Sequence, residues 1–196
     1  MAAAEQFLTR TGIPVCIRPI APADRDALHA NFLKLSAESR YRRFLGVLDD
    51  LSPAMLTRLT EVDHRNHEAL AAFSDGELIG VARFIRRQAD DEAAEVAVTI
   101  ADDWQGQGLG TELLLRLEDR AIAVGVNTFV ATCLVDNRGM LNVFRDLPGA
   151  TCTINAPVGG VVEVLLTLSP DRPRAELARV VRAGANAFSG ARHPVP

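Results

Sequence analysis

The fold of this chain is decided by the stretch Glu95-Val-Ala-Val-Thr-Ile-Ala-Asp-Asp-Trp-Gln-Gly-Gln-Gly-Leu-Gly110. Its first six residues are rich in β-branched side chains and predict a strand. Residues 111–124 carry leucines at helical spacing and predict a helix that ends at Gly125. A glycine-rich turn between a strand and a helix presents unpaired backbone N–H groups at the positive end of the helix dipole. This stretch therefore predicts a site for a phosphate group.

The spacing of the glycines narrows the choice of phosphate ligand. A Walker loop needs a lysine before its serine or threonine, but Gly110 is followed directly by Thr111. The dinucleotide fingerprint needs the spacing G-x-G-x-x-G early in a βαβ unit, whereas Gly106, Gly108 and Gly110 follow the spacing G-x-G-x-G. From the residues alone, a tight turn that binds no ligand remains an alternative.

The residues before this stretch predict a strand, three helices and a hairpin. Asp75-Gly76 joins the apolar runs 68–74 and 77–86 and indicates a two-residue hairpin turn, in which both positions need positive φ. The acidic residues 90–92 predict a loop. The other predicted elements are a strand over residues 14–19, a helix from Asp24 with Leu28, Phe32, Leu33 and Leu35 on its apolar stripe, an arginine-rich helix over residues 39–48, and a helix that begins at Ser52-Pro53.

The residues after the glycine-rich stretch predict a strand, a short helix and a second hairpin, over residues 126–135, 137–147, and 151–154 with 161–168. Residues 1–168 are therefore expected to form one domain. Residues 169–196 contain four prolines around one amphipathic segment, residues 175–182. The two interpretations of this C-terminal tail are a loosely docked or disordered segment and a helix that packs against a neighbour or against a second subunit in a homodimer.

Composition excludes several classes of protein. The chain has 196 residues, 48% hydrophobic and 23% charged, which is typical of a folded globular protein and not of a disordered one. A net charge of −4 argues against nucleic-acid binding. There is no apolar run long enough to span a membrane and no secretory signal pattern. The widely spaced Cys16, Cys133 and Cys152 predict reduced, buried thiols in a cytoplasmic protein.

The pattern Gln105-x-x-Gly108-x-Gly110 between a strand and a helix resembles the acyl-CoA pyrophosphate loop of the GNAT superfamily of N-acetyltransferases. The resemblance runs from about residue 15 to residue 168. It also rests on Ile17-Arg-Pro-Ile20, on Gly76-Glu-Leu-Ile-Gly-Val-Ala82 and on Asn137-Arg-Gly-Met140. Residues 35–44 and 102–108 resemble the bacterial protein-lysine acetyltransferase branch. That branch often carries a regulatory nucleotide-sensing or synthetase-like domain, which we do not expect here because about 14 residues precede the first predicted strand.

The resemblance implies an α/β GNAT fold: a mixed, mostly antiparallel sheet of about seven strands with helices on both faces. It implies a splay between the fourth and fifth strands of the family, which admits the pantetheine arm of acetyl-CoA, the acyl donor. It implies no metal. The residues that it assigns to acetyl-CoA binding are Val98, Thr99 and Ile100 along the arm, Gln105, Gly106, Gln107, Gly108, Leu109, Gly110 and Thr111 around the pyrophosphate, and Asn137 from the next helix.

The same resemblance places the catalytic base at Glu95. Acetyl transfer needs a deprotonated amine and a donor to the developing oxyanion, which a backbone N–H of the splayed strand can supply. A solvated glutamate is the alternative for Glu95, and Asp91 and Glu92 are competitors in the acidic segment. Many GNAT enzymes have a tyrosine seven residues after the asparagine, as the acid for the leaving thiolate. This position is Phe144 here, and the only tyrosine is Tyr41.

The sequence therefore predicts an acetyl-CoA-dependent N-acetyltransferase that acts on a protein lysine. A small-molecule amine as acceptor is the second hypothesis, and a non-catalytic acyl-CoA sensor, favoured by Phe144, is the third. Neither nucleic acid nor a membrane is expected as a partner. His64 and His67 lack a third ligand at metal spacing. The arginines at positions 40, 42 and 43 indicate either a solvated helix face or an acidic acceptor.

Overall fold

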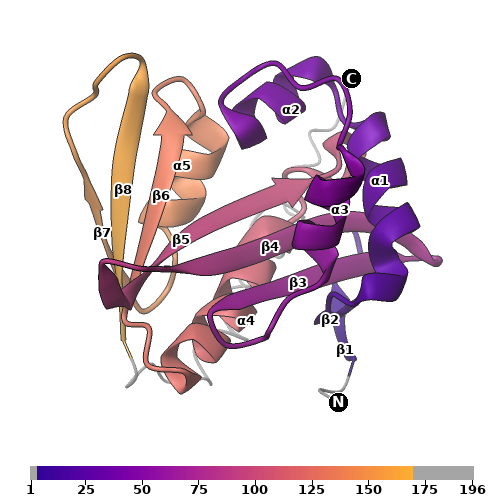
Figure 1. Ribbon diagram of the computed structural model, residues 1–196, viewed down its shortest axis with the longest axis horizontal. Coiled ribbons are helices and arrows are strands. Elements are labelled where there is room, and N and C mark those ends of the chain that lie inside the picture. The colour runs from indigo at the N-terminus through magenta and orange to yellow at the C-terminus, as the bar shows by residue number, and fades with distance from the viewer. Residues whose placement is uncertain (1–3, 170–196) are drawn as a thin grey trace, which may run out of the picture.

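A computed structural model describes residues 4–169 of the chain. In this part of the chain eight strands form one sheet in the order β1-β2-β3-β4-β5-β6-β8-β7 (Figure 1). All neighbouring pairs are antiparallel except β5 and β6, which are parallel. The strands are β1 (Glu5–Leu8), β2 (Pro14–Pro19), β3 (His67–Ser74), β4 (Glu77–Arg87), β5 (Asp90–Ile100), β6 (Thr128–Leu134), β7 (Ala150–Ile154) and β8 (Val161–Leu168). The predicted mixed, mostly antiparallel sheet is confirmed, with one strand more than expected.

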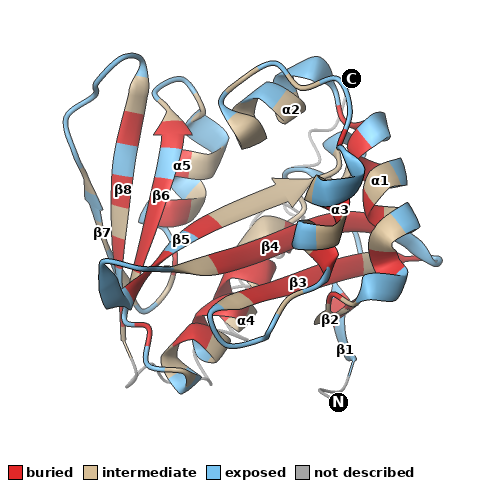
Figure 2. Cartoon of the chain, viewed as in Figure 1, coloured by how far each residue is buried: buried red, intermediate tan, exposed pale blue. Residues whose placement is uncertain are grey.

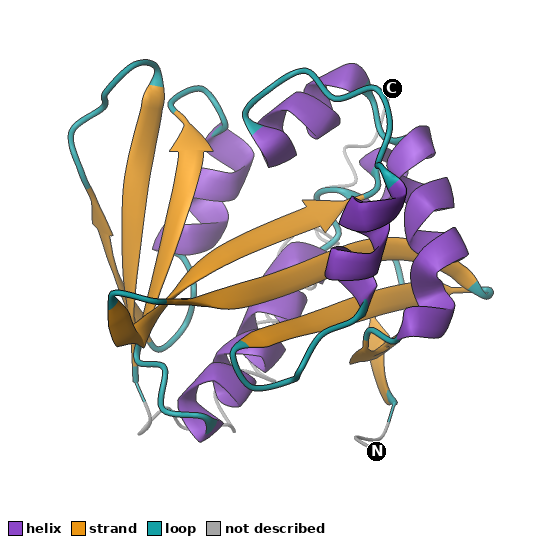
Figure 3. Ribbon diagram, in the orientation of Figure 1, coloured by secondary structure: helices purple, strands orange, loops and turns teal. Residues whose placement is uncertain are grey.

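Helices cover both faces of the sheet, as expected. Figure 3 shows α1 and α3 on one side of β3 and β4 and α4 on the other. The bounds are α1 (Arg25–Lys34), α2 (Ala37–Phe44), α3 (Pro53–Thr60), α4 (Leu109–Ala123) and α5 (Arg138–Arg145), with short 3-10 turns at Pro22–Asp24 and Asp102–Trp104. None of these helices is long and apolar enough to cross a membrane. The predicted tail helix, residues 175–182, lies outside the described residues.

Two hydrophobic cores pack against the opposite faces of the central strands β3 and β4. Phe84 of β4 packs with α4 on one face, whereas Val81 of the same strand packs with α1 and α3 on the other. A strand that is covered on both faces loses the alternation of buried and exposed residues. Accordingly, seven consecutive residues of β4 are buried, and Figure 2 shows β3 and β4 as the most continuously buried strands.

Local sequence signals fixed several boundaries. Asp75 and Gly76 both have positive φ, 48° and 81°, and they close the hairpin in which Ser74 pairs with Glu77. Ser52 caps α3 by accepting a hydrogen bond from Met55 N, and Pro53 occupies the first turn of that helix. Gly125 follows α4 with φ of 85°. These three predictions are confirmed.

Other boundaries were wrong, and each has a physical reason. Residues 90–92 are not a loop, because β5 begins at Asp90 and pairs with Arg87 across a register shift in the hairpin. The arginine-rich helix ends at Phe44 and not at residue 48, because Leu45 takes a left-handed conformation with φ of 52°. Leu33 is 53% exposed, so its predicted place on the apolar stripe of α1 is wrong, because it directly follows the buried Phe32 and adjacent residues lie on different faces of a helix.

The first predicted strand is in fact the second strand of the sheet. Residues Glu5–Leu8 form β1, an edge strand that pairs only with β2. Its four residues are too few to show a period, and only Phe7 is buried. The β1–β2 turn brings Arg10 and Thr11 to the glycine-rich stretch.

Candidate functional site

A gap opens in the sheet where β5 and β6 separate. The two strands pair only between Ala93–Glu95 and Thr128–Val130, and they diverge beyond Glu95. Ala101 N donates to Ile79 O, on the β4 side of β5. Because hydrogen bonding alternates along an antiparallel strand, the backbone groups of Thr99 also face β4, whereas those of Val98 and Ile100 face the gap. The diverging strands thus expose a strand edge without a strand partner.

A cavity of about 320 Å³ occupies this gap. One wall is β5 from Val96 to Ile100, and the other is β6 from Ala131 to Cys133. Met140, Val143 and Phe144 of α5 also line the cavity. Two strand edges and an apolar helix face make a channel suited to a long, narrow ligand with amide groups along its length.

The glycine-rich turn, residues 105–110, lines one part of the cavity. Gly106 and Gly108 have φ of 73° and 86°, conformations that favour glycine. Gly108 is the N-cap of the 15-residue helix α4 and offers no side chain to the first-turn N–H groups. These N–H groups and the positive end of the helix dipole are therefore available to an anion.

The structure brings together most of the residues that the sequence assigned to the ligand. The ones that line the cavity are Val98, Thr99, Ile100, Gln105, Gly106, Gly108, Gly110, Thr111 and Asn137. Gln107 and Leu109 do not. Leu109 is buried in the core, and Gln107 braces the turn by donating from Nε2 to Asp103 O and accepting from Thr11 Oγ1.

Arg10 is a cavity-lining residue that the sequence analysis missed. Its backbone N donates to Gln107 O at 3.1 Å and its Nη1 to Gly106 O at 3.3 Å. It thus places a guanidinium beside the glycine-rich turn, where a phosphate would need a counter-charge. No motif could have indicated this, because 96 residues separate Arg10 from Gly106.

The residues of β6 and α5 in the cavity carry no strong nucleophile. Asn137 Oδ1 caps α5 by accepting from Met140 N at 3.2 Å. Phe144 is 2% exposed and has no proton to donate. Burial raises the pKa of the Cys133 thiol to about 11, so this group stays protonated at neutral pH. All three cysteines are free, as predicted, but only Cys133 is buried.

Glu95 lies on β5 at the last position paired with β6, opposite Val130. Its side chain is exposed, and it makes no hydrogen bond or ion pair with any other residue within 4–169. Its competitor Glu92 is engaged, because Glu92 Oε2 accepts from Asn127 Nδ2 at 2.6 Å. Glu95 is thus a carboxylate at the start of the gap whose oxygens no other residue within 4–169 engages.

Helix α2 borders the cavity with Ser39, Arg42 and Arg43. Its N-terminus is tied to the glycine-rich stretch through Asp102, whose carboxylate accepts from Ser36 N at 2.7 Å and from the hydroxyl of Ser39. Burial opposes the ionisation of Asp102, but these hydrogen bonds outweigh it and lower the pKa of the carboxyl group. Gln105 Nε2 also donates a hydrogen bond to Asp102 Oδ1, at 3.2 Å.

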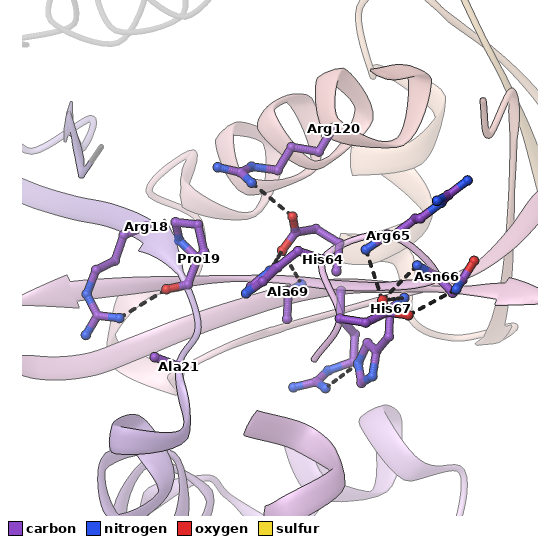
Figure 4. A network of polar contacts seen from close by, with 12 residues as sticks. Arg18, Pro19, Ala21, His64, Arg65, Asn66, His67, Ala69 and Arg120 are labelled. Carbon is purple, nitrogen blue, oxygen red and sulfur yellow. Dashed lines mark hydrogen bonds and ion pairs between the residues drawn. The ribbon is translucent and has the colours of Figure 1, made fainter. Parts of the chain in front are cut away.

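Arg83 of β4 is buried on the same side of the sheet as α1 and α3. Its Nη1 and Nη2 donate to Leu59 O at 3.2 Å, and Nη1 also contacts His67 Nε2 at 3.1 Å. Figure 4 shows His67 within this polar network, close to Asn66 and Arg65. Burial, followed by the charge of Arg83, lowers the pKa of His67 to about 4. His67 is therefore neutral at pH 7, so its Nε2 accepts a hydrogen bond from the guanidinium.

Between pH 7 and pH 5 the wild-type protein is expected to lose about 1–2 kcal/mol more unfolding free energy than a His67→Gln variant. The pKa of His67 is lower in the folded state than in the unfolded state, so in this interval the unfolded state binds more protons. Stability therefore falls as pH falls. The amide of the His67→Gln variant would still accept from Arg83 but does not titrate. Urea unfolding of both proteins at the two pH values measures the difference, and parallel losses would refute it.

Comparison with known proteins gives a matching family and several similar proteins. The acetyltransferase (GNAT) family matches residues 33–147. "Acetyltransferase Pat" of Mycolicibacterium smegmatis is 37% identical over 140 residues, 70% of this chain. "Acetyltransferase PA5475" of Pseudomonas aeruginosa is 36% identical over 140 residues, which is 69% of this chain and 73% of that protein. The crystal structure of the GNAT domain of S. lividans PAT is 31% identical and superposes with a TM-score of 0.78, covering 84% of this chain and 97% of that one. The chain spans only 42% of the length of the M. smegmatis relative.

Proposed function

The chain belongs to the GNAT family of acetyltransferases, and from this premise we propose that it transfers the acetyl group of acetyl-CoA to a lysine ε-amine of a protein. The observation that carries the proposal is the 320 Å³ cavity between β5 and β6, which ends at the glycine-rich turn. An acyl-CoA has an extended amide-bearing arm and a pyrophosphate, and the two parts of this cavity match them. A protein acceptor is supported by the resemblance of residues 35–44 and 102–108 to the protein-lysine acetyltransferase branch, together with the likeness to two proteins named Pat.

Each part of acetyl-CoA has a counterpart in the cavity. The pantetheine amides would pair with the backbone groups of Val98 and Ile100 that face the gap, as an added strand would. The pyrophosphate would lie on the N–H groups at the start of α4, with Arg10 as counter-charge. Asn137 contributes a polar group from the wall opposite β5.

From the chain, the reaction needs one carboxylate and one backbone N–H. Glu95 accepts a proton from the lysine ammonium, directly or through water, and the free amine attacks the thioester carbon. A backbone N–H of β5 in the gap donates to the oxyanion. The attacking nitrogen then loses its second proton to water, the C–S bond breaks, and the sulfur leaves as a thiolate, which leaves the neutral amide as product. Because Phe144 has no hydroxyl, the thiolate leaves unassisted or takes its proton from water.

Thiol release distinguishes the proposed enzyme from its alternatives. The protein is mixed with acetyl-CoA and, separately, with lysine-containing peptides and small primary amines, and the free CoA thiol is measured. We expect release with lysine peptides, together with acetyl-lysine in the product by mass spectrometry. Release with small amines alone would assign the enzyme to metabolite acetylation. Acetyl-CoA binding without thiol release would make the protein an acyl-CoA sensor, the function that Phe144 favours.

A further inference from the structure

A second, smaller cavity adjoins the acyl-CoA cavity on the side of the sheet that α1 and α3 cover. Its volume is about 40 Å³, and Arg43 and Thr99 line both cavities. A volume of about 10–15 Å³ suffices for one water molecule, so this chamber has room for a small polar group such as a carboxylate. Most of the residues that line it are apolar, and they come from α1, α2, α3, the segments next to these helices and β4.

Two arginines line this chamber. Arg43 projects from α2, with its guanidinium 4.8 Å from the ring centre of Phe44, and Arg83, 4% exposed, projects from β4. Burial, then the charges of Arg43 and Arg58, lower the pKa of Arg83 to about 9. Both groups remain cationic at neutral pH, so the chamber concentrates positive charge in apolar surroundings.

The described part of the chain supplies no carboxylate to balance these charges. Within residues 4–169, neither Arg43 nor Arg83 lies within 4.0 Å of a carboxylate oxygen. By contrast, Arg42 on the same helix pairs with Glu38. Buried charges in folded proteins are normally paired, and clefts lined by one sign of charge attract ligands of the other sign. The missing partner is therefore expected to come from outside residues 4–169.

The chamber lies where an acceptor would enter. Val98 and Ile100 pack with the core on the α4 side, so Thr99, which alternates with them on β5, faces the opposite side. The donor would thus reach the gap past α4, and the acceptor would approach from the side of α2, past Arg43. A carboxylate in the chamber would anchor the acceptor close to the thioester.

We propose that Arg43 and Arg83 form a carboxylate-binding subsite, which makes the enzyme selective for amines that carry a carboxylate near the reacting nitrogen. This inference rests on the proposed function, since it names the acceptor class of the same site. In a protein, the carboxylate comes from an aspartate or glutamate beside the lysine. In a small molecule, it is the α-carboxylate of an amino acid.

Matched acceptors test the subsite without presupposing turnover. The probes are two blocked peptides, Gly-Lys-Glu-Gly and Gly-Lys-Gln-Gly, which differ in one carboxylate, with free lysine and lysine amide as the small-molecule pair. Binding to the full chain with CoA is measured by calorimetry, and kcat/KM by thiol release. We expect the glutamate peptide to be favoured by about 10- to 100-fold, the value of a charged hydrogen bond. A preference confined to free lysine would place the carboxylate on a small molecule.

Substitutions on α2 test whether the preference for the glutamate peptide comes from the chamber. Arg43→Gln should reduce the ratio between the two peptides to near one, and Arg43→Lys should retain part of it, because an ammonium keeps the charge without the planar fork. Arg40→Gln is the matched control, because Arg40 lies on the same helix but lines neither cavity. Arg83→Met removes the hydrogen bonds to Leu59 and can unfold the protein, so Arg43 carries the test.

The outcomes separate this proposal from the proposed function. Equal binding within both acceptor pairs by the wild-type protein, or an unchanged preference in Arg43→Gln, would overturn the subsite even if thiol is released. Preferential binding of the glutamate peptide without any thiol release would instead overturn the enzymatic proposal and keep the subsite.

Discussion

Replacing Gly108 with glutamate is expected to abolish the rise in melting temperature that acetyl-CoA produces in the wild-type protein. A ligand that binds only the folded state stabilises it by about 2.7 kcal/mol at 100 times Kd. Gly108 is the N-cap of α4, where the pyrophosphate would lie. A glutamate there adds a negative charge and bulk beside Arg10, whose atoms a Cβ at this position would already contact at 3.7–3.8 Å. Scanning calorimetry with and without acetyl-CoA measures the loss.

A second glycine provides the matched control. Gly76 has φ of 81°, close to the 86° of Gly108, and lies in the β3–β4 hairpin away from the cavity. Gly76→Glu therefore adds the same side chain in the same backbone conformation, so it carries a comparable strain. It should lower the melting temperature of the free protein but keep the shift with acetyl-CoA. If Gly108→Glu keeps that shift as well, the glycine-rich turn does not bind the pyrophosphate.

Replacing Glu95 with glutamine is expected to lower turnover at pH 7 by about 10²–10⁴-fold, the usual contribution of a general base. The amide keeps the size of the side chain but cannot accept the proton of the amine. Affinity for acetyl-CoA should stay nearly unchanged, because Glu95 lies outside the cavity lining. Initial rates of thiol release and a calorimetric Kd separate the two effects.

Glu92→Gln is the control for this variant. Glu92 lies before the paired segment of β5 and β6, away from the gap, and its carboxylate is held by Asn127, so turnover should change little. Raising the pH should restore part of the rate of the Glu95→Gln enzyme, because the lysine amine, with an ordinary pKa of about 10.4, then loses its proton in solution. Wild-type turnover in Glu95→Gln at pH 7 would remove Glu95 from the mechanism. A loss in Glu92→Gln instead would assign the base to Glu92.

Much of the fold was predictable because the decisive signals are local. Asp75-Gly76 specifies a hairpin through its positive φ angles, and Ser52-Pro53 specifies a helix start through its cap. The glycine-rich turn identifies the end of a strand and the start of a helix in one segment. Errors occurred where local signals were weak: β1 has four residues, and the acidic start of β5 is stabilised by pairing with β4 and not by its own composition.

The candidate site likewise has one part that the sequence predicts and another part that only the tertiary structure determines. Residues 95–110 lie on one continuous segment, so the sequence determined the glycine-rich turn, the strand before it and the helix behind it. Only the tertiary structure decided which distant residues complete the site. Arg10 lies on the β1–β2 turn, Arg43 on α2 and Arg83 on β4. The tertiary structure also decided that the two arginines have no carboxylate partner within residues 4–169, because the charge balance of a buried group depends on which elements pack around it and not on its neighbours in sequence.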